Sequence, residues 1–244
     1  MSQQPFQFKK FKVHQDRCAM KIGTDGVLLG AWSSIEHEPK FILDIGAGTG
    51  VVALQLAQRS SASTIDAIEI DDQAHEQCTH NFEHSDWADR LFCYHASVQE
   101  FASEMEHKYD LIVSNPPFFK APKSIDAQTQ NTSQERAVAR FTDTLPFTHL
   151  VVCAAHLLSQ NGVFCTILPQ TEVASFIEIA AQNKLFISKI CTIRGTKTSK
   201  IKRCMLAFST RQSKPKTQEL TIEISRHNYT QEYKNLVSDF YVKM

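Results

Sequence analysis

The feature that most constrains the fold of this chain is a short apolar run that stops at two prolines. Leu111, Ile112 and Val113 form a continuous hydrophobic run, which is typical of a strand covered on both faces in a parallel sheet. Pro116 ends this strand because it has no N–H to donate, and it favours an extended conformation at Asn115. The sequence therefore predicts a stiff turn at the carboxyl end of a buried strand, where open α/β sheets bind ligands.

The residues of this turn suit the recognition of an amino group on a planar ring. Asn115 offers a side-chain carbonyl oxygen, and the main-chain carbonyl of Pro116, held ahead of Pro117, is a second acceptor. Two acceptors can take both hydrogens of an exocyclic amine such as adenine N6. Phe118 or Phe119 supplies an aromatic face, and stacking on such a face contributes about 1–3 kcal/mol per base. Taken alone, the tripeptide is more simply read as a turn, so a second motif is needed.

A second strand-to-turn junction lies upstream, in residues 41–50. Asp44 stands just before a turn that contains Gly46, Gly48 and Gly50, and a helical pattern follows. Such a turn lets a ligand approach the backbone and the N–H groups of the helix. The spacing differs from the dinucleotide Gly-x-Gly-x-x-Gly motif, an acid here would repel a pyrophosphate, and no Gly-Lys-Ser/Thr of a P-loop follows. The motif favours a cationic ligand, such as the amino-acid end of S-adenosylmethionine (SAM).

Further candidate residues follow the next two predicted strands. A carboxylate at the tip of the second strand can accept hydrogen bonds from both hydroxyls of a ribose, a role shared by nucleotide and SAM enzymes. The acids Asp71 and Asp72 are interpreted as helix caps. Ser97 is placed to flank an adenine ring. A helix cap is the simpler interpretation of this serine, and a capping role does not exclude the adenine contact. The candidate cofactor-binding residues at these strand ends are Glu69, Ile70, Ser97 and Val98.

The composition is that of a single globular unit. A chain of 244 residues with 42% hydrophobic content can bury one substantial core, or one core and a small appendage. Its 26 basic and 26 acidic residues cancel, which neither supports nor excludes a nucleic-acid partner. The seven cysteines contain no Cys-x-x-Cys pair and are expected to be reduced core residues. Without a signal-like N-terminus or an 18-residue apolar run, a soluble cytoplasmic protein is expected.

The N-terminal segment carries aromatic residues and then turn chemistry. Phe6, Phe8 and Phe11 predict a short strand or a strand pair. Thr24 or Asp25 is a candidate cap for a helix over residues 27–32, which we interpret as a lid across one end of the sheet.

Together, these motifs resemble the class I SAM-dependent methyltransferases that act on amino groups conjugated to a planar system. The N-terminal segment narrows the resemblance to the tRNA(Val) adenosine-37 N6-methyltransferase family, over about residues 6–210. The motifs that carry it are Asp44-x-Gly46-x-Gly48-x-Gly50, Glu69, Asn115-Pro116-Pro117-Phe118, the stretch from Met20-Lys21-Ile22-Gly23-Thr24-Asp25-Gly26 to Trp32, and Arg203-Cys204-Met205-Leu206.

The resemblance implies SAM as cofactor, S-adenosylhomocysteine as product and tRNA as substrate. It assigns Lys21, Thr24 and Asn115 to the SAM site. It assigns the catalytic site to Asn115, Pro116, Pro117 and Phe118. Hydrogen bonds from the amine to the carbonyls of the Asn-Pro-Pro turn would favour pyramidalisation of the nitrogen. In-line transfer needs the nitrogen and the methyl carbon about 3–3.5 Å apart, and no strong general base. The base must leave its stack, which is easiest in a single-stranded loop.

Charge is distributed unevenly along the chain. The N-terminal segment is basic, residues 189–203 contain no acid, and residues 66–106 contain many acids and one basic residue, Arg90. Residues 120–135 are too polar to pack a core and are expected to form a substrate loop that orders on binding, with a linker that has no role in binding as the alternative. A charge run is often only a solvated face, but this pattern favours a surface that meets phosphates. The candidate RNA-binding residues are Lys9, Lys10, Arg136, Arg140, Arg194, Lys197, Lys200, Lys202 and Arg203.

The predicted fold is an α/β domain with a doubly wound, mostly parallel, seven-stranded Rossmann-like sheet that ends in an antiparallel hairpin. Right-handed crossovers would align the candidate site residues along one rim. The expected parts are an N-terminal basic segment and lid (residues 1–35), a methyltransferase domain (36–210) and an extension without a recognised motif (211–244). A monomer without a metal site is expected. The absence of an internal repeat argues against the duplicated rRNA guanine methyltransferases.

Two alternatives stay open. One is an N-methyltransferase acting on rRNA, DNA or a protein glutamine, although DNA enzymes generally carry a target-recognition domain and the glutamine enzymes a helical N-terminal domain. The other is a non-enzymatic RNA-binding module on a SAM fold. It is disfavoured because Asp44, Glu69 and Asn115 are all present, and architecture alone does not need them.

Overall fold

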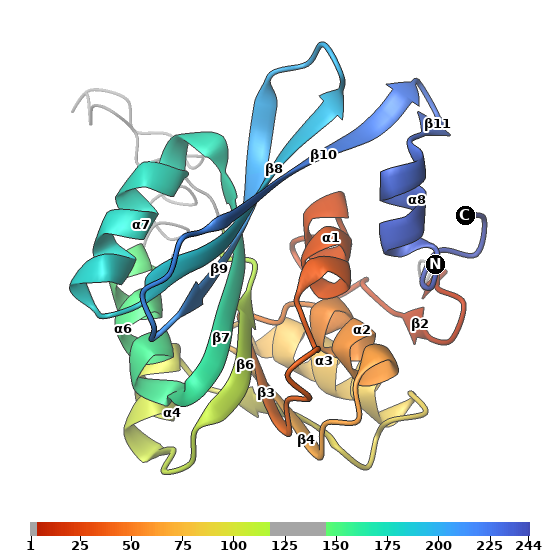
Figure 1. Ribbon diagram of the computed structural model, residues 1–244. Helices are drawn as coiled ribbons and strands as arrows, with labels where there is room; N and C mark the ends of the chain where they lie inside the picture. The colour runs from red at the N-terminus through yellow and green to blue at the C-terminus, as the bar shows by residue number, and fades with distance from the viewer. Residues whose placement is uncertain (1–3, 118–144) are drawn as a thin grey trace, which may run out of the picture.

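The computed structural model describes residues 4–117 and 145–244 (Figure 1). In this part of the chain the main sheet has nine strands, in the order β11-β10-β8-β9-β7-β6-β3-β4-β5. Their bounds are β3 (Phe41–Ile45), β4 (Thr64–Glu69), β5 (Leu91–His95), β6 (Tyr109–Ser114), β7 (Leu158–Pro169), β8 (Phe186–Thr196), β9 (Ile201–Ser209), β10 (Lys216–Ser225) and β11 (Asn228–Tyr229).

Strands β3 to β9 form the predicted mostly parallel sheet. β3 pairs in parallel with β4 and β6, β4 with β5, and β6 with β7, whereas β9 runs antiparallel to β7 and β8. The fold class and the antiparallel hairpin are therefore confirmed. The extension adds two strands to the predicted seven, because β10 pairs in parallel with β8 and β11 folds back onto β10. This pairing satisfies the main-chain edge that β8 would otherwise present.

Helices cover both faces of the sheet, as a doubly wound fold requires. One hydrophobic core contains side chains of α1 (Thr24–Trp32), α2 (Val51–Arg59), α3 (Asp72–Glu83) and α8 (Gln231–Val237). The other contains side chains of α4 (Val98–Glu104), α6 (Phe147–Leu157) and α7 (Val173–Gln182), the last preceded by the short helix η1 (Gln170–Glu172). Figure 1 shows the two helix groups on opposite sides of the sheet.

The N-terminal segment forms the predicted strand pair, β1 (Phe6–Gln7) with β2 (Lys12–Val13). The predicted helix α1 is present, but its predicted cap is wrong. Gly23 is the N-cap residue, with extended backbone and no side-chain capping bond. Thr24 and Asp25 lie inside the first turn, and the Asp25 carboxylate accepts a hydrogen bond from Arg203 Nε at 2.8 Å. A distant ion pair thus outcompetes local capping.

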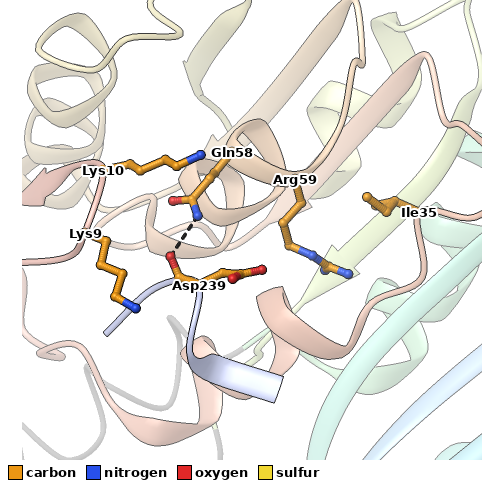
Figure 2. Close-up of a pocket in the computed structure, with 6 residues that line it drawn as sticks. All are labelled: Lys9, Lys10, Ile35, Gln58, Arg59 and Asp239. Atoms are coloured by element: carbon orange, nitrogen blue, oxygen red, sulfur yellow. Dashed lines mark hydrogen bonds between the residues drawn. The ribbon is translucent and has the colours of Figure 1, made fainter. Parts of the chain in front are cut away.

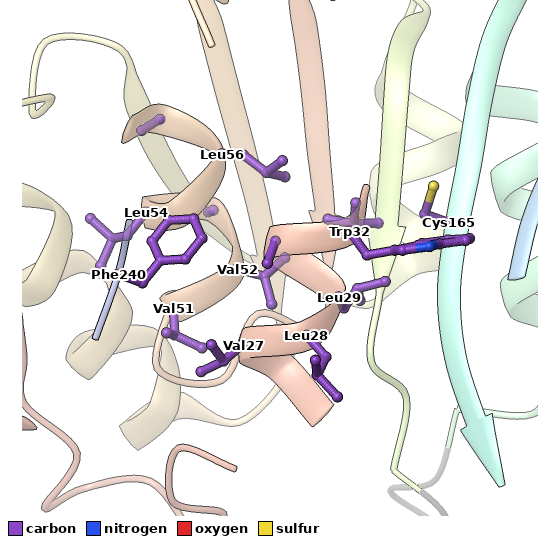
Figure 3. Close-up of a cluster of buried hydrophobic side chains, with 14 of the residues drawn as sticks. Val27, Leu28, Leu29, Trp32, Val51, Val52, Leu54, Leu56, Cys165 and Phe240 are labelled. Carbon is purple, nitrogen blue, oxygen red and sulfur yellow. The ribbon is translucent and has the colours of Figure 1, made fainter. Parts of the chain in front are cut away.

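Helix α1, expected as a lid, is built into the hydrophobic core. Its residues from Gly26 to Trp32 are buried, and Figure 3 shows Val27 near Val51 of α2, and Trp32 beside Cys165 of β7. A Cβ at Gly30 would lie 2.4 Å from Gln55 Oε1, so glycine here permits the close approach of α1 and α2. The first turn of α1 lies near Asn115, since a Cβ at Gly26 would be 4.0 Å from Asn115 Nδ2.

The C-terminal extension packs against α1 and the N-terminal segment. Tyr233, Val237 and Phe240 are buried in the same core as α1, and Figure 3 shows Phe240 beside α2. Lys9 Nζ donates hydrogen bonds to the Ser238 and Met244 carbonyls. The two ends of the chain therefore stabilise each other.

All seven cysteines are free thiols and six of them are buried, as expected for reduced core residues. Across residues 4–117 and 145–244, none of the helices combines the length and apolarity that a membrane span requires.

Candidate active site

Three parallel strands end side by side at one edge of the sheet. Ile45 at the end of β3 pairs with Ile68 of β4 and with Ser114 of β6. The residues that follow these strands therefore begin at the same edge, here called the carboxyl edge. They are the glycine loop (residues 46–50) after β3 and Asn115 after β6, and Glu69, the last residue of β4, lies at the same edge.

The glycine loop has left-handed backbone at three positions, with φ of 73° at Gly46, 55° at Gly48 and 77° at Gly50. A Cβ at Gly50 would lie 2.6 Å from Phe82, so this glycine also permits close packing against α3. At Gly46 and Gly48 nothing lies within 4 Å of a Cβ position. These two positions therefore leave the backbone open to a ligand.

Glu69 holds the glycine loop and is held by its own neighbours. Its Oε2 accepts a hydrogen bond from Gly48 N at 2.8 Å, and its Oε1 accepts from Ile70 N at 2.8 Å and Asp71 N at 3.0 Å. The carboxylate is half-buried at the end of β4, and Ile70 beside it is 56% exposed. Glu69 is thus preorganised at the carboxyl edge, with acceptor capacity for further donors.

Asp44 is buried behind the same loop. Its Oδ2 accepts a hydrogen bond from Ala53 N at 3.2 Å, and only 1% of the residue is exposed. Burial raises the Asp44 pKa to about 7, and the charge of Glu69 adds to this effect. Among the described residues Asp44 takes part in none of the ion pairs. Two acids without a protein cation favour a positively charged ligand.

Asn115 carries an unsatisfied buried acceptor. Its Oδ1 is buried and has no hydrogen-bond partner among the residues that the structure describes. Its Nδ2 lies 4.0 Å from the position of a Cβ on Gly26, so the first turn of α1 adjoins the amide. Buried polar atoms without a partner are rare in folded proteins, and a ligand donor is one explanation for this one. Pro116 is buried and Pro117 half-buried, whereas Phe118 and Phe119 lie outside the described residues.

The other candidate cofactor residues have structural partners. The hydroxyl of Ser97 caps α4 in a reciprocal capping box with Glu100, as its simpler reading predicted, and Val98 is buried in the core. Lys21 is exposed and its Nζ donates to the Gln15 carbonyl, while Thr24 is the exposed first residue of α1. Asp71 caps α3, as predicted. The described residues contain no group of His, Cys, Asp or Glu side chains arranged to hold a metal ion.

Cys18, between β2 and α1, is 5% exposed, as expected for a reduced core residue. Burial raises the Cys18 pKa to about 12, and the charge of Glu69 adds to this effect. Sequence reasoning missed Asn81 of α3, whose Nδ2 donates to the Thr49 carbonyl of the glycine loop at 2.9 Å. No sequence pattern indicated this contact, because it joins residues that are far apart along the chain.

The basic candidates fall into two groups. Lys197, Lys200 and Lys202 are exposed in the β8–β9 hairpin, which projects beyond the sheet at the top of Figure 1. In that hairpin Arg203 pairs with Pro169, the last residue of β7, so the turn extends past the carboxyl edge. Arg194 forms an ion pair with Glu219 at 2.9 Å, and Arg203 forms one with Asp25. Arg136 and Arg140 lie outside the described residues.

Lys9 and Lys10 lie elsewhere, at an open cavity of about 520 Å³ (Figure 2). The cavity is also lined by Gln58 and Arg59 at the end of α2, which returns the chain to the opposite edge of the sheet. The Arg59 guanidinium donates to main-chain carbonyls of α1 and the residue after it. Lys9 and Lys10 are thus separated from the hairpin lysines.

Comparison with known proteins identifies relatives and structural neighbours. The family model of the methyltransferase small domain matches residues 25–144. The tRNA1(Val) (adenine(37)-N6)-methyltransferase of Christiangramia forsetii is 55% identical over 100% of both chains. The protein of the same name from Flavobacterium psychrophilum is 52% identical over 98% of this chain and 100% of the relative.

Solved structures agree on the fold. A predicted O-methyltransferase from Agrobacterium tumefaciens superimposes with a TM-score of 0.67 at 16% identity, over 88% of this chain and 96% of that one. A ribosomal protein L11 methylase from Lactobacillus delbrueckii superimposes with a TM-score of 0.52 at 16% identity, over 77% of each chain. The fold, the motifs and the near full-length sequence identity agree, and the chain belongs to the tRNA1(Val) (adenine(37)-N6)-methyltransferase family.

Proposed function

We propose that this protein transfers a methyl group from SAM to the N6 amino group of adenine 37 in tRNA1(Val). Relatives that carry this name share 52–55% identity with it over nearly the whole chain. The observation that carries the proposal is the buried Oδ1 of Asn115, an acceptor without a described partner at the carboxyl edge. An amino donor on a planar base is the group that such an acceptor fits.

The residues around the glycine loop fit SAM. The open backbone at Gly46 and Gly48 can receive the ligand closely, and Glu69 has capacity to accept from ribose hydroxyls. Asp44, whose pKa is raised by burial, is stabilised in its ionised form by a neighbouring cation. Gly50, Ile70, Lys21, Thr24, Ser97 and Val98 stay in the proposed cofactor set. SAM supplies an electrophilic methyl group on a cationic sulfur.

The Asn-Pro-Pro turn then acts on the amine. The Asn115 Oδ1 and the Pro116 carbonyl would accept both amine hydrogens, which withdraws the nitrogen lone pair from the ring and orients it toward the methyl carbon. The proton is lost after transfer, once the nitrogen is positively charged, so no strong base is needed beforehand. Phe118 stays the proposed stacking partner of the base.

The tRNA backbone is proposed to follow the β8–β9 hairpin. Lys197, Lys200 and Lys202 are exposed and lie past the carboxyl edge, where a base must enter. Arg194 and Arg203 would contribute from ion pairs that already hold them. Lys9 and Lys10 are retained as more distant candidates, and Arg136 and Arg140 as candidates outside the described residues. Since tRNA is a polyanion, lysines at the entrance both attract and orient it.

We also retain the proposed division into an N-terminal segment (1–35), a methyltransferase domain (36–210) and an extension (211–244). A substrate tRNA implies a cytoplasmic location, and a monomer is the proposed form. The pairing of β10 with β8 gives the extension a supporting role in the same sheet.

The test uses purified protein, SAM labelled in its methyl group and unmodified tRNA1(Val). The expected product is N6-methyladenosine at position 37, absent when that adenine is replaced by guanine and when Asn115→Ala is used. Label in rRNA, DNA or a protein glutamine but not in tRNA would favour the related N-methyltransferases. Binding of tRNA without transfer by the wild-type protein would favour a non-catalytic RNA-binding module.

A further inference from the structure

The segment between β2 and the N-cap residue of α1, residues 14–22, is here called the connector. It forms no helix or strand, and two of its main-chain N–H groups bind side-chain amides of α3. His14 N donates to Asn81 Oδ1 at 2.8 Å, and Arg17 N donates to Gln77 Oε1 at 3.1 Å. Both α3 residues are buried, each with 2% exposure. The side-chain amides of Asn81 and Gln77 thus accept the hydrogen bonds that main-chain N–H groups usually make within helices or sheets.

Asn81 makes two further hydrogen bonds, and one of them reaches the glycine loop. Its Nδ2 donates to the His14 carbonyl at 2.8 Å and to the Thr49 carbonyl at 2.9 Å. Thr49 lies between two glycines with left-handed backbone. One buried amide therefore uses an acceptor and two donors to join the connector to the glycine loop.

The Thr49 carbonyl has no helical donor because Thr49 precedes Gly50, the N-cap of α2, and the first intrahelical hydrogen bond runs from Leu54 N to the Gly50 carbonyl. Asn81 supplies its donor. Ala53 N, one of the first N–H groups of α2, donates instead to the buried carboxylate of Asp44. The conformation at the start of α2 therefore depends on both Asp44 and Asn81.

We infer that Asn81 is a positioning residue that couples the packing of the connector against α3 to cofactor binding at the glycine loop. This inference rests on the proposed SAM site. Because coupling is reciprocal, an ordered connector strengthens binding at the loop, and a ligand at the loop stabilises the connector. Cys18, in the middle of the connector, is 5% exposed, so the connector packs against the body of the protein.

Two variants and a matched control test the coupling. Asn81→Leu removes all three hydrogen bonds, and Asn81→Asp retains the acceptor for His14 N while removing both donors. Gln77→Leu, on the same helix, removes one hydrogen bond to the connector and leaves the Asn81 link between the connector and the glycine loop in place. We expect both Asn81 variants to weaken SAM binding in calorimetry roughly tenfold, and Gln77→Leu by less than about threefold. At saturating SAM, kcat and the KM for tRNA should stay within about threefold of wild type.

Hydrogen exchange of the wild-type protein provides an independent readout that needs no variant. S-adenosylhomocysteine should slow hydrogen exchange of the His14 and Arg17 main-chain amides more than exchange of the amides in the β1–β2 pair. Unchanged exchange at both amides, or equal SAM affinity of Asn81→Asp and wild type, would overturn the coupling. Failure of the wild-type protein to bind SAM at all would instead overturn the proposed function.

Discussion

At the scale of single residues, the proposed site depends on two polar side chains with buried oxygen atoms. Asn115 Oδ1 has no described partner, and Asp44 carries a carboxylate away from solvent and from cations. Both features are costly in the free protein. Each is expected to be relieved by a different ligand group, which makes their effects separable.

Asn115→Ala should lower kcat by about 10²–10³-fold and leave the Kd for SAM within a few-fold, because in its proposed role the amide contacts the amine of the base and not the cofactor loop. Single-turnover transfer and calorimetry measure the two quantities. Asn161→Ala removes the same amide from an exposed position near the start of β7 and should behave as wild type. Wild-type transfer by Asn115→Ala would refute the assigned role.

Asp44 should make both stability and SAM affinity depend on pH. Its pKa is raised to about 7 by burial, so the folded protein holds this proton more tightly than the unfolded chain. The stability it contributes is complete below about pH 4 and is lost as the pH rises to about 7. A cationic ligand favours the ionised form, so SAM should bind several-fold more tightly at pH 8 than at pH 6.

Asp44→Asn should flatten both dependences while weakening SAM binding at pH 8. Urea unfolding of the free protein and calorimetry in buffers of different ionisation enthalpy test these changes. An identical pH profile in the variant and the wild type would show that another group is responsible.

At the scale of elements, the contact of α1 with α2 determines where the first turn of α1 meets Asn115. Gly30 is required for this contact because a Cβ there would lie 2.4 Å from Gln55 Oε1. A Cβ at Gly26, one turn earlier, would lie 3.4 Å from its nearest neighbour, Val51 Cγ1, which is an ordinary van der Waals contact. The two glycines of one helix therefore differ in what they tolerate.

Gly30→Ala should lower the free energy of unfolding by about 1–3 kcal/mol through overpacking. Gly26→Ala should change it by less than about 1 kcal/mol, since alanine also favours helix formation. Urea denaturation of both variants gives the comparison. Equal stabilities would mean that Gln55 moves aside freely and that the close approach is not restrictive.

At the scale of the whole molecule, the basic hairpin and the C-terminal extension have separate roles. The hairpin lysines lie past this edge, and the C-terminal extension buttresses α1 from outside the predicted domain. Binding of tRNA, a large polyanion, tests the role of the hairpin lysines. The free energy of unfolding tests the role of the extension.

Simultaneous replacement of Lys197, Lys200 and Lys202 by alanine should weaken tRNA binding at least tenfold. It should also lower the slope of log K against log salt concentration by an amount that corresponds to the loss of up to three phosphate contacts. A matched control replaces Lys40, Lys108 and Lys184, which precede β3, β6 and β8 at the opposite edge. Filter binding at several salt concentrations should show a much smaller effect for the control. Equal losses for both sets would indicate a general charge effect without a defined surface.

Phe240→Ala tests the extension. The ring is 1% exposed in the core shared with α1, so its removal should cost about 3–5 kcal/mol. Val242→Ala, at a position that is 53% exposed, should cost less than about 1 kcal/mol. Thermal and urea unfolding distinguish the two variants. A small effect of Phe240→Ala would mean that the extension is dispensable for the fold.

The sequence by itself determined the strand ends and the chemistry they carry. Asn115, Glu69 and the glycine loop were found because each follows an apolar run, and parallel strands bring their carboxyl ends to one edge. The hairpin of β8 and β9 and the helix caps at Asp71 and Ser97 followed from equally local patterns. Their catalytic and binding roles stay predictions.

Only the tertiary structure decided the contacts between distant segments. Asp25 was expected to cap α1 but pairs with Arg203, and the extension pairs β10 with β8. Asn81 joins two segments that are more than thirty residues from it. Periodicity and capping rules describe neighbours in sequence, whereas these partners are chosen by packing, where a buried polar group must find whichever donor or acceptor the fold brings to it.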